Sequence, residues 1–156
     1  MTKYCYDYPR PCVTVDIMVL CNNKSEKKIL LIQRKNEPFK NMWALPGGFV
    51  DIDEELDVAA KRELLEETGI KIDKIYQFET IGTIGRDPRA RTISIIYFAF
   101  VDNADSLTLK ASDDAKSVKW FNINQLPELA FDHKVIINMA INRLFSKKII
   151  TTQPGI

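Results

Sequence analysis

The spacing of hydrophobic residues along the first fifty positions is that of short strands separated by turns. Residues 13–20 are apolar and mostly β-branched except for Asp16, and they follow two prolines that exclude the preceding segment from a sheet interior. Polar residues 22–28 separate this run from a second apolar run at 29–32. We therefore expect a hairpin of two strands, followed by a proline-glycine break at residues 46–48.

The hydrophobic period then changes to that of a helix over residues 55–68. Gly69 lies where a left-handed residue would end this helix, and Asp51 or Asp53 could cap its first turn. The last helix is predicted over residues 132–147. Between the two helices, apolar runs predict further strands, the first two paired as a hairpin, at residues 71–85, 91–101 and 118–121.

No internal repeat or linker divides the 156 residues, so we expect one domain over residues 1–156, with residues 151–156 as a frayed tail. The order of elements predicts the α/β class, with helices packed on a mixed sheet. Hydrophobic residues make up 46% of the chain, which is enough for a sizeable core. Because no apolar run reaches the length of a membrane span, we expect no membrane partner.

Cysteine content and net charge narrow the location and the partners. Three cysteines match no zinc pattern and cannot form a closed disulfide framework, and the N-terminal residues lack the apolar run of a signal peptide. We therefore expect a reducing, cytoplasmic setting. The formal charge of +1 excludes a protein that coats nucleic acid through bulk charge, so no nucleic-acid partner is expected.

Carboxylates interrupt the apolar stripe of the helix predicted at 55–68. Glu63 and Glu67 fall in the middle of a stripe that is otherwise small or branched and apolar, made of Leu56, Ala59, Ala60 and Leu64. Val58 and Leu65 point the opposite way, which predicts neighbours on both faces of the helix.

Three features of these acids are unfavourable for a simple surface helix. Glu63 and Glu67 repel each other at i,i+4 spacing, their stripe faces the core, and Glu66 and Glu67 lie at the negative end of the helix dipole. An ordinary solvated acidic face, with Lys61 and Arg62 as partners, is the alternative. The apolar stripe favours a shared hard cation, Mg²⁺ or Mn²⁺.

The same residues form a longer pattern. Gly48, five residues, Glu54, seven residues, and then Arg62-Glu63-Leu64-x-Glu66-Glu67-x-Gly69-Ile70 resemble the Nudix box of the Nudix hydrolase superfamily at every defined position. The resemblance implies an α/β/α sandwich with a mixed sheet. It also implies hydrolysis of a nucleoside diphosphate linked to another moiety.

The resemblance implies a role for each acid of the box. Metal ligation would come from Glu63, Glu67 and the Gly47 carbonyl, with Glu66 as a third carboxylate ligand or as the base. The catalytic set implied in this way also includes two supporting residues, Glu54 near the metal shell and Arg62, which orients the carboxylates. A metal ion would polarise a phosphoryl oxygen and lower the pKa of bound water, whose deprotonation a nearby carboxylate completes.

Segments outside the box are similar to one branch of the superfamily. They are residues 8–11, 43–50, 85–89 and 129–133. That branch contains ADP-ribose pyrophosphatases, Nudix domains fused to nicotinamide mononucleotide adenylyltransferases, and Nudix-related regulators of NAD metabolism. The resemblance therefore implies a Mg²⁺-dependent enzyme that converts ADP-ribose to AMP and ribose 5-phosphate, and a homodimer.

Two other functions remain open at this stage. One is a house-cleaning hydrolase that releases pyrophosphate from nucleoside triphosphates. The other is a nucleotide-sensing module that controls transcription. The intact box acids and the few residues after the last predicted helix count against the sensing module.

Several residues outside the box are candidates for contact with the substrate. Arg86, Arg89 and Arg91 in the second hairpin suit a pyrophosphate or a terminal ribose, although hairpin arginines are often only solvated. Arg34 is a further phosphate candidate, and Phe49 could stack on adenine, as could Tyr4, Tyr6 and Tyr8, although such aromatics often only pack.

Candidates for an auxiliary acid or base are few. Asp113 and Asp114 lie in a polar loop where this superfamily often keeps an additional acid. For His133, a role with Asp132 in capping the last helix is favoured over catalysis.

The small net charge conceals a segregated pattern. Residues 48–70 contain eight acids against Lys61 and Arg62, so this segment carries −6 and the remaining chain +7. Such a pattern suits a cation-holding helix inside a protein that binds anionic nucleotides.

Overall fold

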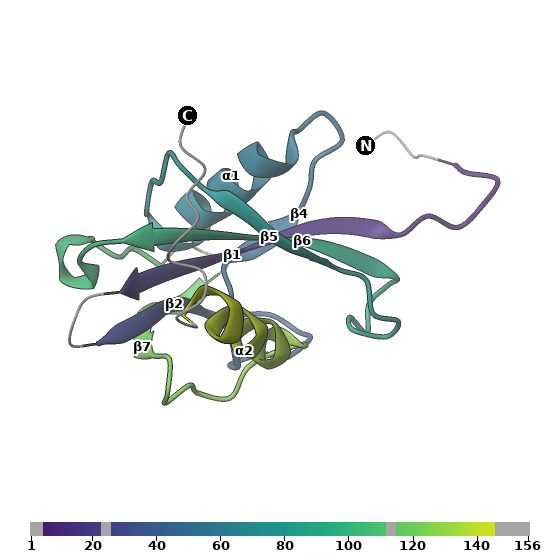
Figure 1. Cartoon of the computed structure of the whole chain (residues 1–156). Helices are drawn as coiled ribbons and strands as arrows, with labels where there is room; N and C mark the ends of the chain where they lie inside the picture. The colour runs from purple at the N-terminus through teal and green to yellow at the C-terminus, as the bar shows by residue number, and fades with distance from the viewer. Residues whose placement is uncertain (1–4, 23–25, 112–114, 146–156) are drawn as a thin grey trace.

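The computed structural model describes residues 5–22, 26–111 and 115–145. It consists of one seven-stranded sheet with α1 on one face and α2 on the other, so the predicted α/β/α sandwich is confirmed (Figure 1). The elements are β1 (Cys12–Asn22), β2 (Lys27–Arg34), β3 (Trp43–Ala44), β4 (Gly47–Phe49), α1 (Leu56–Thr68), β5 (Tyr76–Ile81), β6 (Thr92–Val101), the 3₁₀ turn η1 (Ala104–Ser106), β7 (Ala115–Asn122) and α2 (His133–Leu144).

The sheet is mixed, with the strand order β3-β2-β1-β6-β5, and with β4 paired to β1 and β7 paired to β2. Strands β1 and β6 run parallel, while β1 with β2 and β5 with β6 form the two expected antiparallel pairs. The second hairpin is shorter than predicted, because β5 covers only Tyr76–Ile81. The apolar residues on either side of β5 lie in loops.

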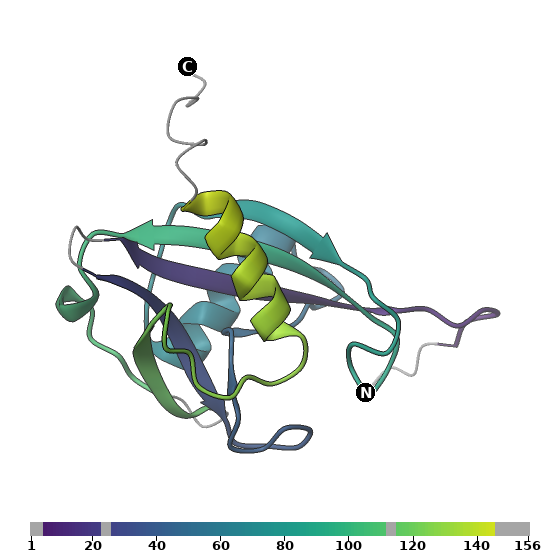
Figure 2. The ribbon, with the colours of Figure 1, turned by 60° about the horizontal axis from the view of Figure 1, so that its bottom comes forward.

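Strand β1 lies at the centre of two hydrophobic cores, one on each face of the sheet. Its side chains alternate, so that Val15, Ile17 and Val19 pack with the apolar stripe of α1, whereas Met18 and Leu20 pack with α2. Figure 2 shows α2 lying across its face of the sheet. Burial on both faces explains why the strand is apolar almost throughout. By the same alternation, Asp16 lies on the α2 face.

Helix α1 ends as predicted and begins differently. Gly69 adopts a left-handed conformation with φ of 73° and donates its N–H to the carbonyl of Leu65. The expected cap by Asp51 or Asp53 is wrong, because Glu55 occupies the capping position and no side chain caps the helix. Residues 51–54 instead form a turn in which Glu54 N–H donates to the Asp51 carbonyl.

Among the described residues, none forms a second core on the outer face of α1. Val58 and Leu65 are about half exposed, so the prediction of neighbours on both faces is wrong for the part of the chain that the structure describes. Helix α2 is described as far as Leu144, and the predicted tail at 151–156 lies outside the described residues. Within the described ranges, neither helix is long and apolar enough to cross a membrane.

Candidate active site

The carboxylates of α1 and the preceding turn gather around one arginine. Arg62 Nε and Nη2 each donate to one oxygen of Glu54 at 2.8 Å, and Nη1 donates to Glu63 at 2.7 Å and to Glu66 at 3.1 Å. Arg62 Nη2 also donates to the Phe49 carbonyl at 3.1 Å, which ties the helix to β4. These charge-assisted bonds raise the pKa of Arg62 and lower the pKa of Glu54. The orienting role implied for Arg62 therefore has a matching geometry.

Glu63 fits under β4 because residue 48 is glycine. A Cβ at Gly48 would lie 2.5 Å from Glu63 Cδ, far inside contact distance. The glycine of the box is thus the space that the carboxylate occupies. Burial raises the pKa of Glu63, and the neighbouring Arg62 opposes that rise.

Glu67 lies deeper at the same edge. Gly47 N–H donates to its Oε2 at 2.9 Å. Burial raises the pKa of Glu67 to about 8, the Gly47 hydrogen bond opposes the rise, and the negative charges of Glu63 and Asp16 add to it. At neutral pH the ionised form of this carboxyl group is therefore disfavoured, and a nearby positive charge would stabilise it.

The residues present fit a hard divalent cation by their chemistry. All candidate ligands at this edge are oxygen donors, as Mg²⁺ or Mn²⁺ requires, namely the carboxylates of Glu63, Glu66 and Glu67 and the Gly47 carbonyl. Over the described ranges, no three carboxylate, thiol or imidazole groups converge on one point. Arg62 instead holds Glu63 and Glu66, while Glu67 lies apart from it.

A pocket opens beside Glu67, between the glycine-rich turn, the second hairpin and the start of α2. Its charged lining is balanced, with three cations and three acids: Arg34, Arg86, Arg89, Asp16, Glu67 and Asp87. Gly47, Gly48, Phe49 and Phe131 complete much of the rim. The pocket therefore joins the acidic edge of α1 to a surface that carries both charge and aromatic rings.

Arg34 is the pocket cation with the most unused hydrogen-bonding capacity. Its Nε donates to the Pro38 carbonyl at 2.8 Å, and its guanidinium lies over the Phe131 ring at 4.9 Å from the centroid. Burial lowers its pKa. In the part of the chain that the structure describes, no carboxylate pairs with it, so both terminal amino groups can bind an anion.

Arg89 and Phe49 lie together at the rim. Arg89 donates through Nε and Nη2 to the two oxygens of Asp87, at 3.0 and 2.7 Å. Its guanidinium lies 5.2 Å from the centroid of Phe49 and 5.5 Å from that of Phe131. Phe49 is 45% exposed, so its ring is accessible to a ligand.

The other two hairpin arginines differ from Arg89. Arg86 is buried in the pocket wall, where it donates to both carboxylate oxygens of Asp132, at 2.9 and 2.7 Å, and to the hydroxyl of Ser94. Arg91 donates to the carbonyls of Gly82 and Thr83 and does not line the pocket. The structure thus brings Arg89 and Arg86 to the pocket and leaves Arg91 outside it.

His133 is buried rather than poised to titrate. Leu45 N–H donates to His133 Nδ1 at 2.9 Å, and burial lowers the pKa of the imidazole. Asp132 occupies the capping position of α2 as expected, but its carboxylate binds Arg86 and makes no capping hydrogen bond. Asp113 and Asp114 lie outside the described residues.

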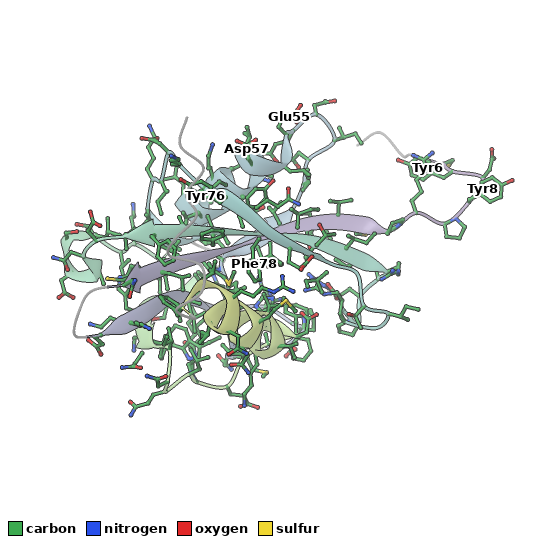
Figure 3. All side chains as sticks on the ribbon, in the orientation of Figure 1. Tyr6, Tyr8, Glu55, Asp57, Tyr76 and Phe78 are labelled. Carbon is green, nitrogen blue, oxygen red and sulfur yellow. The ribbon has the colours of Figure 1, made fainter. Side chains whose placement is uncertain are left out.

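The tyrosines before β1 are not part of the pocket. Tyr6 and Tyr8 lie on an arm that extends away from the sheet, and Tyr8 is 81% exposed (Figure 3). Tyr4 is outside the described ranges. Stacking of adenine on Tyr6 or Tyr8 of the same chain therefore has no support from their placement.

Asp16 and Phe131 are among the lining residues that the sequence interpretation missed. For Asp16 a signal was present, since it is the one acid within the apolar run of residues 13–20. Phe131 has φ of 52°, a sharp turn before α2 that no local pattern announced.

Comparison with known proteins identifies the family of this chain. A NUDIX domain family model matches residues 10–139. The ADP-ribose pyrophosphatase of Methanocaldococcus jannaschii is 45% identical over 131 residues, which cover 83% of this chain and 73% of that protein. The ADPR responsive transcriptional repressor NtrR of Acinetobacter baylyi is 39% identical over 153 residues, which cover 95% of this chain and 60% of the repressor.

Solved structures give the same picture. The NUDIX domain of Shewanella oneidensis NrtR, complexed with ADP ribose, has a TM-score of 0.81 at 33% identity, over 89% of this chain and 94% of that domain. A bifunctional NMN adenylyltransferase/ADP ribose pyrophosphatase from Francisella tularensis has a TM-score of 0.76 at 35% identity, over 88% of this chain. The chain spans 42% of that bifunctional protein and 60% of the repressor.

Proposed function

Since this chain belongs to the NUDIX domain family and is a Nudix hydrolase, we propose that it is a Mg²⁺-dependent pyrophosphohydrolase that cleaves ADP-ribose to AMP and ribose 5-phosphate. The observation that carries the proposal is the position of Glu67. Its carboxylate belongs to the acidic edge of α1 and also lines the pocket that holds Arg34 and Arg89. A phosphate bound by these arginines would lie beside the acids.

The proposed reaction breaks one P–O bond of the diphosphate with water. The water oxygen forms the new bond to phosphorus, the other phosphate leaves, and the released proton passes to a carboxylate. When bound, a divalent cation supplies the charge that polarises a phosphoryl oxygen and acidifies the attacking water. We assign the proton to Glu66, whose side chain is 56% exposed and therefore within reach of solvent water.

The remaining groups have separate roles in this proposal. Glu63, Glu67 and the Gly47 carbonyl would hold the cation, and Arg62 keeps Glu63 and Glu66 in place together with Glu54. Because the terminal amino groups of Arg34 are unused in the described part of the chain, they would bind the diphosphate.

The adenine would lie at the aromatic rim. Phe49 and Phe131 present rings on which a base can stack, and Arg89 lies near both of them. The NUDIX domain of Shewanella oneidensis NrtR was solved with ADP ribose, which supports the same ligand class for this chain.

Product analysis tests the proposal. Incubation with ADP-ribose and Mg²⁺, followed by mass spectrometry, is expected to show equimolar AMP and ribose 5-phosphate, and chelation of the cation should stop their formation. Absence of AMP at saturating ADP-ribose would overturn the proposal. Release of pyrophosphate from nucleoside triphosphates at a higher kcat/KM would favour the house-cleaning alternative, and a parallel series with Mn²⁺ compares the metals.

A second candidate is a module that binds ADP-ribose to control transcription. The similarity to the Acinetobacter repressor extends over 95% of this chain, which favours this candidate. A gel-shift titration with promoter fragments at moderate salt would distinguish the two. Sequence-specific DNA binding that ADP-ribose releases, without turnover, would replace the hydrolase proposal.

We also propose a homodimer. Val58 and Leu65 form an exposed apolar strip on α1, and Tyr6 and Tyr8 extend from the body on the N-terminal arm. A second copy would cover such surfaces. Light scattering should give twice the mass of 17.9 kDa, and a monomer at micromolar concentration would contradict the dimer.

A further inference from the structure

Asp16 is an unusual residue for the centre of a sheet. It lies in the middle of β1, is 8% exposed, and lines the pocket on the α2 side. Gly47 of β4 pairs with Asp16 so closely that a Cβ at Gly47 would lie 2.9 Å from Asp16 Oδ1. The backbone around the carboxylate is therefore tightly packed, and its open side is the pocket.

The carboxylate of Asp16 has no hydrogen-bond donor among the residues described in the structure. His133 Nε2 lies 3.7 Å from Asp16 Oδ1, which is too long for a direct hydrogen bond. Leaving a buried carboxylate in this state is costly unless something in the pocket donates to it. The natural donor is water in the free protein and a ligand group in the complex.

The tautomer of His133 defines what that ligand group can be. Because Nδ1 accepts from Leu45 N–H, the ring proton of the neutral imidazole lies on Nε2. Nε2–H therefore acts as a donor next to the acceptor Oδ1 of Asp16. A donor and an acceptor 3.7 Å apart can both bind one small group lying between them.

A hydroxyl satisfies both partners. It donates one hydrogen bond and accepts others, whereas an ammonium group or a cation cannot accept from Nε2–H. A phosphate oxygen would be repelled by Asp16. We propose that Asp16 and His133 form a subsite that binds a 2′ or 3′ ribose hydroxyl of the substrate, an inference that rests on the proposed function for the identity of the nucleotide.

A buried polar chain behind the subsite keeps it in place. Asp132, next to His133, is held by two hydrogen bonds from Arg86, and Arg86 also donates to Ser94. Ser94 shares a hydrogen bond of 2.5 Å with Thr14, two residues before Asp16 on β1. The start of α2 and strand β1 are thus connected through β6, so the separation between Nε2 and Oδ1 is set by packing.

The test compares Asp16→Asn with the wild-type protein on matched ligands. The ligands are ADP-ribose and four analogues, each lacking the 2′ or 3′ hydroxyl of either the adenosine ribose or the second ribose. Binding is measured by calorimetry with EDTA, where no metal-dependent turnover interferes, and kcat/KM is measured with Mg²⁺. Asparagine keeps the size of the side chain beside Gly47, and Glu79→Gln, at an exposed ion pair with Arg143, serves as the matched control.

One analogue should bind the wild-type protein about 10- to 100-fold more weakly than ADP-ribose, as expected for a hydrogen bond to a charged group. In Asp16→Asn this ratio should fall to within about threefold, while Glu79→Gln keeps it. The position of the missing hydroxyl identifies which ribose occupies the subsite. A merely structural role for Asp16 would weaken all five ligands equally.

An unchanged ratio in Asp16→Asn, or equal binding of all five ligands by the wild-type protein, would overturn the inference. Hydrolysis of ADP-ribose in that case leaves the proposed function intact. Asp16-dependent selection of a hydroxyl without hydrolysis would overturn the proposed function alone, and failure to bind or cleave any ligand would overturn both. If Asp16→Asn fails to fold, His133→Asn, which keeps an acceptor near Leu45 N–H and removes Nε2–H, should narrow the same ratio.

Discussion

Two of the arginine-carboxylate groups, one around Arg62 and one around Arg86, differ in charge balance and in burial. Arg62 faces the three carboxylates of Glu54, Glu63 and Glu66, and 27% of its side chain is exposed. Arg86 forms its ion pair with a single carboxylate of the described residues, that of Asp132, and 5% of its side chain is exposed. The first group has excess negative charge that a cation can use, whereas the second consumes its charge in holding β6 to α2. Under the proposed function, the same pair of residue types serves chemistry in one place and architecture in the other.

The largest contrast should come from removing an acid beside the first group. Glu67→Gln is expected to lower kcat by about 1000-fold, because a ligand to the catalytic cation contributes several kcal/mol to the transition state. The unfolding midpoint should not fall, since Gln still accepts from Gly47 N–H. Steady-state kinetics and thermal denaturation measure the two effects. Unchanged turnover would remove Glu67 from the mechanism.

Breaking the Arg86–Asp132 ion pair should instead lower the stability of the protein. Arg86→Met is expected to lower the free energy of unfolding by about 3 kcal/mol, because it leaves Asp132 without its partner. Urea denaturation measures this loss, and adding Asp132→Leu should recover part of it. Arg91→Met, at an arginine that contacts only hairpin carbonyls, is the control and should cost less than about 0.5 kcal/mol. Wild-type stability of Arg86→Met would contradict the architectural role.

The pH dependence of stability should show a smaller difference between the acidic edge of α1 and the Arg86 group. Burial raises the pKa of Glu67 from 4.5 to about 8 in the folded protein, so the folded state binds more protons than the unfolded state within that window. Stability of the metal-free protein should therefore fall as pH rises from about 5 to about 8, on the order of 2 kcal/mol because pocket water moderates the effect.

Denaturant titrations at several pH values with EDTA test this slope. Glu67→Gln should flatten it, and so should saturating Mg²⁺, because a bound cation keeps the carboxylate ionised. Arg86→Met should lower the whole curve without changing its slope. A slope that persists in Glu67→Gln would assign the titration to another group.

Local patterns were sufficient for most elements of the fold. The helical period of α1 and its end at Gly69 can be recognised from fourteen consecutive residues. The hairpin of β1 and β2 can be recognised from twenty-three. The capping residue of α1 was missed because Glu54 turns toward Arg62, a partner eight residues away, and the turn leaves Glu55 at the cap. The length of β5 was overestimated because its apolar flanks lie in loops.

The site divides in the same way. The acids of the box lie on one helix and one turn, so spacing alone brings them together. The pocket instead depends on the parallel register of β1 with β6, which places Thr14 beside Ser94 across eighty positions of sequence. Asp16 and His133 meet only because α2 covers that face of the sheet. The hydrophobic period of a single segment cannot predict a contact between residues so far apart in the sequence.

The absence of a side chain at residue 48 has a consequence for how this protein can change over evolutionary time. An alanine there would place a methyl group where the Glu63 carboxylate now lies, while Arg34, Asp16 and the aromatic rim would stay untouched. The mutant would lose an acid from its reactive edge and keep the residues that are proposed to bind the nucleotide. A single added methyl group at residue 48 could therefore convert a catalyst of this fold into a receptor that binds without turnover.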